Sequence, residues 1–265
     1  MTPFQSYEEE NITYWTRRTP GYSSVNQEEL STQQRGVWSE LLSERIQARY
    51  PGCRPEDIRV LDVGTGPGFF AIILAEMGYR ITAVDYTASM LEAARRNAGT
   101  LGRRISFRQM NAEALDFPDD TFDVVVSRNL TWNLPHPENA YSQWNRVLKP
   151  GGLLLNFDAN WYSYLRCETA REAHLQDREN IRQAGVGDET AGTDVAAMEA
   201  IALQAPLSGI RRPAWDRDTL QKCGMHPAAN EQIWKRVWTE EERINNASTR
   251  MFMIEAVKKG AAPLC

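Results

Sequence analysis

The stretch Val60-Leu61-Asp62-Val63-Gly64-Thr65-Gly66-Pro67-Gly68-Phe69-Phe70 decides the fold class. A short apolar run of strand character ends here in three alternating glycines, and a run with helical spacing over 69–77 follows at once. Glycines between a strand and a helix let the backbone approach a ligand and leave the N-terminal amides of the helix facing it. A tight turn alone does not require three alternating glycines, so we interpret the loop as a ligand-binding loop.

The sequence after this loop alternates between strand-like and helix-like segments. Strands are predicted at 58–63, 81–84, 105–110, 122–127 and 153–157. Segments with helical spacing separate them, at 69–77, 89–98 and 137–148. Strands that alternate with helices predict a parallel sheet with helices on both faces, and continuously apolar strands indicate burial on both sides. We therefore expect an α/β fold with a doubly wound sheet.

The flanking segments have a different pattern. Residues 28–50 show the spacing of an amphipathic helix, and the first 24 residues are aromatic and polar with weak helical periodicity. Beyond residue 160 we predict two helices, at 164–183 and 196–203, in an insertion over the edge of the sheet. A short helix and two strands are expected to follow, at 218–223, 230–238 and 250–257.

Composition narrows the class of protein. The 265 residues are 42% apolar and 25% charged, as in an ordinary globular protein, and the net charge of −5 does not favour nucleic acid or an anionic membrane as a partner. The four cysteines lie far apart in the sequence, and the three histidines lack carboxylates at ligand spacing, so we expect no metal site. The scattered cysteines and the absence of a signal-peptide pattern predict a cytoplasmic protein.

The glycine loop resembles the first motif of class I S-adenosylmethionine-dependent methyltransferases. Dinucleotide-binding enzymes use Gly-x-Gly-x-x-Gly, whereas here an acidic residue precedes Gly-x-Gly-x-Gly. The residues that match the methyltransferase form position by position are Asp62, Gly64, Gly66 and Gly68. Downstream, residues 84–91 are similar to the family segment Val-Asp-x-Ser-x-x-Met-Leu, and residues 109–115 to its Asp-Ala-Glu-x-Leu motif. Within the family, the sequence is nearest the small-molecule enzymes of ubiquinone and menaquinone biosynthesis.

The resemblance implies a Rossmann-like, mostly parallel seven-stranded sheet with an antiparallel last strand. It divides the chain into an N-terminal helical lid (1–50), a cofactor-binding core (55–160), a cap insertion (161–213) and a last helix with antiparallel strands (214–265). The cofactor that it implies is S-adenosylmethionine, and the partner is a small-molecule methyl acceptor rather than nucleic acid or a membrane.

The resemblance also implies which residues bind this cofactor. Asp85, at the end of the second strand, is expected to accept hydrogen bonds from the ribose hydroxyls, with Tyr86 beside the adenine. Met90 is either the floor of the pocket or a plain core residue, and the amide oxygen of Asn111 replaces the acid that usually accepts from the adenine amino group. The full expected set is Asp62, Gly64, Thr65, Gly66, Gly68, Phe69, Asp85, Tyr86, Met90, Asn111, Ala112, Glu113, Arg128, Tyr14 and Trp15.

The end of the fourth strand is expected to face the transferred methyl group, because ligands bind beyond the carboxyl ends of parallel strands. Arg128 is a candidate to bind a carboxylate of the acceptor or of the cofactor, Asn129 to orient an acceptor amine or hydroxyl, and His136 to act as a base. Residues expected to contact the acceptor are Tyr22, Trp132, Asp158 and Trp161. For Trp132, a role in plugging the core is an equal alternative.

Other functions remain open from the sequence. A catalytically degenerate S-adenosylmethionine-binding module keeps the same motifs, whereas the glycine spacing disfavours a nicotinamide-dependent oxidoreductase. The acidic balance disfavours a nucleic-acid methyltransferase. The sequence leaves the acceptor, the methylated atom and the oligomeric state undetermined.

Overall fold

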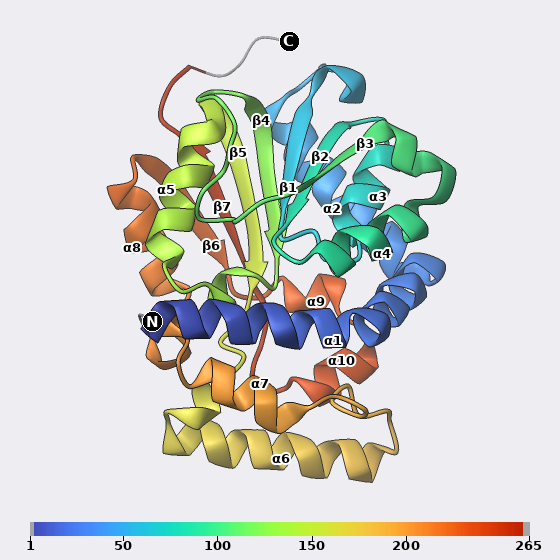
Figure 1. The fold of residues 1–265 in the computed structure, drawn as a ribbon, viewed down its shortest axis with the longest axis vertical. Helices are drawn as coiled ribbons and strands as arrows, with labels where there is room; N and C mark the ends of the chain where they lie inside the picture. The colour runs from blue at the N-terminus through green and yellow to red at the C-terminus, as the bar shows by residue number, and fades with distance from the viewer. Residues whose placement is uncertain (1–2, 262–265) are drawn as a thin grey trace.

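Seven strands form one sheet in the order β3-β2-β1-β4-β5-β7-β6 (Figure 1). The computed structural model describes residues 3–261. The strands are Arg59–Val63 (β1), Arg80–Asp85 (β2), Ile105–Gln109 (β3), Phe122–Arg128 (β4), Leu148–Asp158 (β5), Met225–Asn230 (β6) and Phe252–Lys258 (β7). The first five strands pair in parallel, and β7 pairs antiparallel with both β5 and β6. The expected doubly wound, mostly parallel sheet is confirmed.

Helices cover both faces of the sheet and the carboxyl ends of its strands. The helices are Pro3–Ser31 (α1), Gln33–Arg49 (α2), Phe69–Glu76 (α3), Ala88–Ala98 (α4), Pro137–Val147 (α5), Glu168–Ala184 (α6), Val195–Ala202 (α7), Ala214–Lys222 (α8), Trp234–Val237 (α9) and Glu240–Asn245 (α10). In Figure 1, α1 crosses below the carboxyl ends of the strands, α7 lies beneath α1, and α6 lies farthest from the sheet. Among residues 3–261, no helix combines the length and the apolar character needed to span a bilayer.

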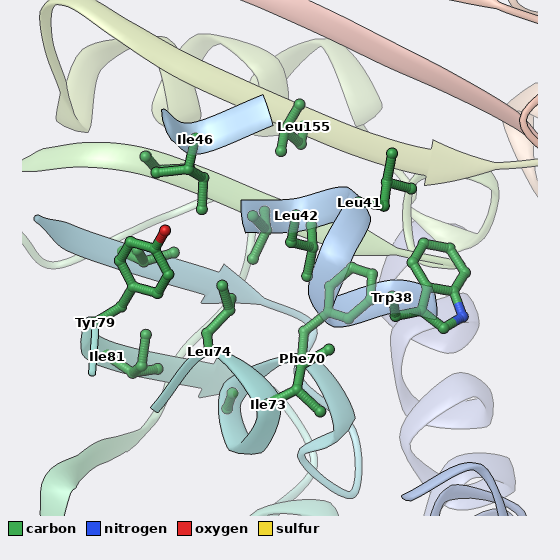
Figure 2. Close-up of a cluster of buried hydrophobic side chains, with 14 of the residues drawn as sticks. Trp38, Leu41, Leu42, Ile46, Phe70, Ile73, Leu74, Tyr79, Ile81 and Leu155 are labelled. Atoms are coloured by element: carbon green, nitrogen blue, oxygen red, sulfur yellow. The ribbon is translucent and has the colours of Figure 1, made fainter. Parts of the chain in front are cut away.

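The larger core lies between the sheet and the helices α2 and α3. Figure 2 shows Leu42 and Ile46 of α2 pointing toward Leu74 of α3, and all three side chains are completely buried. The Phe70 ring meets the Trp38 ring in a T-shaped contact with centroids 5.2 Å apart. Helix α3 begins directly after the glycine loop, so this packing fixes the loop against the sheet.

The opposite face of the sheet is covered by α5 and α8. Tyr141 and Trp144 of α5 are fully buried with Leu220 of α8. The Trp144 indole donates a hydrogen bond to the Ala112 carbonyl over 3.0 Å. This bond ties α5 to the loop that follows β3.

The prediction of a strand over 230–238 is wrong. The edge strand β6 ends at Asn230, and residues 234–237 form the short helix α9. Ile233 and Val237 are four residues apart and both buried, which is helical spacing, and they pack into the core beside α2. β6 contains Pro227, which an edge strand tolerates and which lowers its strand signal in the sequence.

Two smaller expectations also need correction. The helix expected over 28–50 is interrupted, because Thr32 has an extended backbone (ψ of 179°) that separates α1 from α2. The N-terminal segment with weak periodicity is the first part of the long helix α1, which contains Pro20. Cys167 and Cys223 are free.

Replacing Leu42 by alanine should lower the free energy of unfolding by about 3 kcal/mol, because a fully buried leucine leaves a cavity. Chemical denaturation measures this change. The matched control is Leu175→Ala on α6, where the side chain is 62% exposed and the expected change is within about 0.5 kcal/mol. Equal losses in the two variants would contradict the core described here.

Candidate functional site

The glycine loop adopts a backbone that side chains would obstruct. Gly64, Gly66 and Gly68 have φ values of 69°, 52° and 97°, in the left-handed region that favours glycine. A Cβ atom on Gly64 would lie 2.7 Å from the Leu130 side chain, and one on Gly68 would lie 3.0 Å from the Cβ of Ala94. The loop therefore presents bare backbone where the ends of β1 and β4 meet.

Asp62 stabilises the conformation of the glycine loop through hydrogen bonds. Its carboxylate accepts hydrogen bonds from the Thr65 hydroxyl at 2.6 Å and from the Ala71 amide at 3.1 Å. The side chain is buried, and burial raises the pKa of Asp62 to about 7, although the two hydrogen bonds oppose this. Asp62 thus positions the loop and does not face a cavity.

Asp85, at the end of β2, joins the glycine loop to the next turn. Its carboxylate accepts from the Gly66 amide at 2.9 Å and from the Thr87 amide at 2.8 Å. Burial raises the pKa of Asp85, and these amides lower it. Each carboxylate oxygen has further lone pairs and can accept another hydrogen bond from a ligand.

These two loops border a cavity that we call the glycine-loop cleft. It encloses about 910 Å³ including its opening. Its walls come from β2 and β4, from the loops after β1, β2, β3 and β4, and from α4 and α1. The lining residues are Gly64, Gly66, Val84, Asp85, Tyr86, Thr87, Met90, Met110, Asn111, Ala112, Arg128, Asn129, Leu130, Asn133, Leu134, Pro135, Glu8, Asn11, Ile12, Trp15 and Tyr22.

A second cavity, which we call the aromatic chamber, adjoins this cleft. It encloses about 950 Å³ including its opening. The lining residues are Tyr14, Trp15, Tyr22, Asn129, Trp132, Trp161, Tyr162, Tyr164, His174, Asp177, Arg178, Thr190, Thr193, Val195, Met198, Asn245, Asn246 and Thr249. Trp15, Tyr22 and Asn129 line both cavities, and we call these three residues the junction.

Asn129 stands out at the junction. Its backbone is left-handed, with a φ of 57°, and is fixed by a 2.8 Å bond from its amide to the Phe157 carbonyl and a 3.1 Å bond from the Trp132 indole to its own carbonyl. The side-chain amide lies beside the Tyr22 hydroxyl. Within residues 3–261, the buried Oδ1 of Asn129 has no hydrogen-bond partner. A buried acceptor without a partner is costly, so it points to a donor supplied by a ligand.

The neighbouring Arg128 is paired with α1. Its two terminal nitrogens donate to the two carboxylate oxygens of Glu29, both over 2.8 Å. The guanidinium also lies 4.7 Å from the centroid of the Phe69 ring. Burial lowers the pKa of Arg128, but the Glu29 carboxylate outweighs burial and the net shift is upward. Arg128 therefore binds a carboxylate of the protein itself, which corrects the expectation that it binds one of a ligand.

Comparison with known proteins places the central segment in a family. Residues 61–156 match the family described as Methyltransferase domain. This segment, about a third of the chain, is similar to methyltransferase domains. It carries the glycine loop, Asp85 and Asn129, and the match confirms the resemblance to class I methyltransferases that the motifs indicated.

Two curated methyltransferases match about a third of the chain at 40% and 41% identity. Phosphatidylethanolamine N-methyltransferase of Cereibacter sphaeroides is 40% identical over 96 residues, which cover 36% of this chain and 47% of the relative. Ubiquinone/menaquinone biosynthesis C-methyltransferase of Vibrio vulnificus is 41% identical over 111 residues, 39% of this chain and 42% of the relative. The chain thus spans about half the length of the curated relatives it matches.

A solved structure matches almost the whole chain. A chain from the complex between the Haloferax volcanii Trm112 methyltransferase activator and a methyltransferase has a TM-score of 0.56 at 17% identity. The match covers 94% of this chain and 99% of the other. At this identity it supports the class I methyltransferase fold alone.

The structure brings most of the predicted cofactor residues of the methyltransferase domain to the cleft, but not all of them. Asp62, Thr65, Gly68, Phe69 and Glu113 line neither cavity and support the cleft from behind. Tyr14 lines the aromatic chamber and not the cleft. The remaining expected cofactor residues all line the cleft, namely Gly64, Gly66, Asp85, Tyr86, Met90, Asn111, Ala112, Arg128 and Trp15.

Two predicted acceptor or catalytic residues are placed elsewhere. His136 lines neither cavity, and its backbone amide donates to the Glu113 carboxylate over 2.6 Å. Asp158 is completely buried and forms an ion pair with Arg212 at 2.7 Å. Its carboxylate also accepts from the Trp132 amide and the Trp161 indole, so Asp158 holds the chamber wall and is not free to contact an acceptor.

A polar contact that no sequence motif marks places α1 over the cleft. The Asn133 side chain donates to Asn11 over 2.8 Å, and the Tyr7 hydroxyl donates to the Asn133 carbonyl over 3.0 Å. Tyr7, Asn11 and Trp15 recur every four residues and so share one face of α1. This four-residue spacing can be read from the sequence. However, polar and aromatic residues do not form the apolar stripe from which an amphipathic helix is predicted.

The aromatic chamber also contains residues that sequence reasoning did not assign. Tyr162 and Tyr164 follow β5, and His174 and Arg178 project from α6. Nothing in their local sequence marks them as neighbours of Asn129. Within the described part of the chain, no three His, Cys, Asp or Glu side chains gather as a metal site requires.

Removing one partner of the Arg128–Glu29 pair should be costly. Glu29→Ala leaves a buried guanidinium unpaired, and we expect a loss of about 3–5 kcal/mol in the free energy of unfolding. The double variant Glu29→Leu with Arg128→Met should regain most of it, because no buried charge remains. The exposed pair Arg54–Asp57 gives the control, since Asp57→Ala should change stability very little. Denaturant titration of the parent protein and the three variants measures these changes in the free energy of unfolding.

The raised pKa of Asp62 predicts a pH dependence of stability. Between its ordinary value of 3.8 and its folded value of about 7, the native state binds more protons than the unfolded state. The free energy of unfolding contributed by this group therefore falls as pH rises through that window. In Asp62→Asn, which cannot titrate, the fall between pH ~4 and ~7 should be smaller than in the parent protein. Parallel curves for the two proteins would refute this role of burial.

Proposed function

We propose that this chain transfers a methyl group from S-adenosylmethionine to a small-molecule acceptor. The observation that carries the proposal is the pair of cavities that meet at Trp15, Tyr22 and Asn129. One cavity is bordered by the glycine loop and the other by aromatic side chains, so a donor and an acceptor can meet at the junction. The methyltransferases among the relatives support the same reaction class.

The residues of the glycine-loop cleft fit S-adenosylmethionine. The backbone of Gly64 and Gly66 is bare toward the cleft, and Asp85 retains lone pairs for two ribose hydroxyls. Met90 and Ala112 offer apolar walls to an adenine ring. When bound, S-adenosylmethionine supplies a methyl group already attached to a good leaving group.

The other proposed contacts follow from the positions of single side chains. Tyr86 is 42% exposed at the rim, where its ring can cover the adenine. The Asn111 amide oxygen already accepts from the Glu113 amide over 2.8 Å. Its NH2 group is therefore the better partner for the cofactor, and it would donate to a ring nitrogen.

Helix α1 would serve as the lid of this site. It supplies Trp15 and Tyr22 to both cavities, and it is anchored to the end of β4 by Glu29. Methyl transfer requires alignment of the nucleophile with the S–CH3 bond and exclusion of water, and both are tasks for a wall of this kind. A cytoplasmic location, the expectation from the sequence, stays part of this proposal.

Calorimetry with S-adenosylmethionine tests the proposal. Asp85→Ala should weaken binding by about 2–3 kcal/mol, since two charge-assisted hydrogen bonds are lost. The control Asp57→Ala removes an exposed carboxylate just before the amino end of β1, whereas the cleft lies beyond the carboxyl ends of the strands, and this variant should bind as the parent does. Binding of a nicotinamide dinucleotide in place of S-adenosylmethionine would reject the proposal. Binding without turnover of any acceptor would favour a degenerate module.

A further inference from the structure

The chemistry of the junction favours positive charge. Its three residues offer the unpartnered Oδ1 of Asn129 and the rings of Trp15 and Tyr22. A carbonyl oxygen only accepts hydrogen bonds, and the faces of aromatic rings attract cations. Arg128 beside the junction is neutralised by Glu29.

Resting on the proposed function, we propose that the acceptor is a primary or secondary amine whose N–H group donates to Oδ1 of Asn129. In the reaction the nitrogen lone pair forms the new N–CH3 bond while the S–CH3 bond breaks, and the electrons of that bond stay on sulfur. Nitrogen becomes positively charged, and one of its protons then leaves to solvent. The N–H group becomes more acidic as the N–CH3 bond forms, so its hydrogen bond to Asn129 is stronger in the transition state than in the bound substrate. This difference lowers the activation barrier.

Hydroxyl acceptors fit the junction less well. A phenol or alcohol must lose its proton before or during attack, and the resulting oxyanion would face the Asn129 oxygen and two aromatic faces. Taking the proton from that hydroxyl calls for a base at the junction. Of the three junction residues, only Tyr22 titrates, and burial raises its pKa, so it is no base at neutral pH.

Titratable groups approach the junction from several elements. They are Tyr14, Arg18 and Glu29 from α1, Arg128 from β4, Tyr162 and Tyr164 after β5, His174, Asp177 and Arg178 from α6, and Glu242 from α10. The Asp177 carboxylate accepts from the Ser248 amide and hydroxyl. His174 stacks on Tyr164 with centroids 3.9 Å apart, on the helix farthest from the sheet (Figure 1). The bound ammonium form of the amine must lose a proton to solvent before its nitrogen attacks.

The chamber walls indicate the rest of the molecule. The Trp132 and Tyr162 rings lie 4.8 Å apart between centroids, and Tyr162 and Tyr164 lie 5.9 Å apart. With His174 they form a continuous aromatic wall from the junction toward α6. We infer an amine on an aromatic or apolar body.

The proposal predicts how many methyl groups an amine can receive. A neutral primary or secondary amine keeps an N–H for Asn129 while its lone pair attacks. A neutral tertiary amine has none. Methylation should therefore stop at the tertiary amine and give no quaternary product.

The first test measures binding, with S-adenosylhomocysteine in the cleft. At neutral pH, 2-phenylethylamine should bind at least about tenfold more tightly than 2-phenylethanol, because its N–H bond is charge-assisted. Asn129→Gly, which keeps the left-handed backbone without strain, should abolish this preference. Asn145 of α5 also has a buried amide oxygen without a partner in residues 3–261 but lies outside both cavities, so Asn145→Ala should keep the preference.

The second test measures methylation of 2-phenylethylamine, its N-methyl and N,N-dimethyl forms, 4-ethylphenol and 2-phenylethanethiol. Mass spectrometry should show methylation of the first two alone. In Asn129→Asp, a carboxylate at the junction holds the amine as ammonium, so the pH of half-maximal rate should rise by about one unit.

The outcomes separate this proposal from the proposed function. Loss of S-adenosylhomocysteine binding by the parent protein would overturn both. Binding of S-adenosylhomocysteine with no preference for the amine over the alcohol would overturn the amine proposal alone. The amine proposal alone would also be overturned by methylation of the phenol or thiol but not the amines, by a quaternary product, or by the absence of methylation of any amine.

Discussion

A buried ion pair between the end of β4 and the first helix is the interaction on which both cavities depend. Arg128 lines the glycine-loop cleft, and the next residue, Asn129, belongs to the junction. Glu29 belongs to α1, the helix that carries Trp15 and Tyr22. The bidentate geometry of the pair therefore sets the distance between the aromatic residues on α1 and the amide at the end of the sheet.

The fold could be predicted where local sequence and global packing agree. The apolar run of β1, the three glycines and the apolar helix α3 are consecutive, and each favours the observed conformation by itself. The prediction failed at β6, whose six residues include one proline and no apolar alternation. That strand exists because β7 offers it an unpaired edge, a tertiary property that no local pattern records.

In the candidate site, too, some features could be predicted from the sequence and others could not. The bare backbone of the glycine loop and the carboxylate after β2 could be predicted, because spacing alone defines them. The fates of Asp158 and Arg128 could not, because each depends on a partner far along the chain, Arg212 in one case and Glu29 in the other. The unpartnered oxygen of Asn129 is likewise visible only once Phe157 and Trp132 fix the backbone around it.

Helix α1 is a wall of both cavities, and this has a thermodynamic consequence. A ligand in the glycine-loop cleft that orders Trp15 and Tyr22 also completes the aromatic chamber, so the second ligand meets a wall whose conformational entropy is already reduced. The two binding equilibria are then linked, and linkage is reciprocal. Each ligand then raises the affinity for the other by the same factor, which makes the shared helix a source of positive heterotropic cooperativity between ligands of the two cavities.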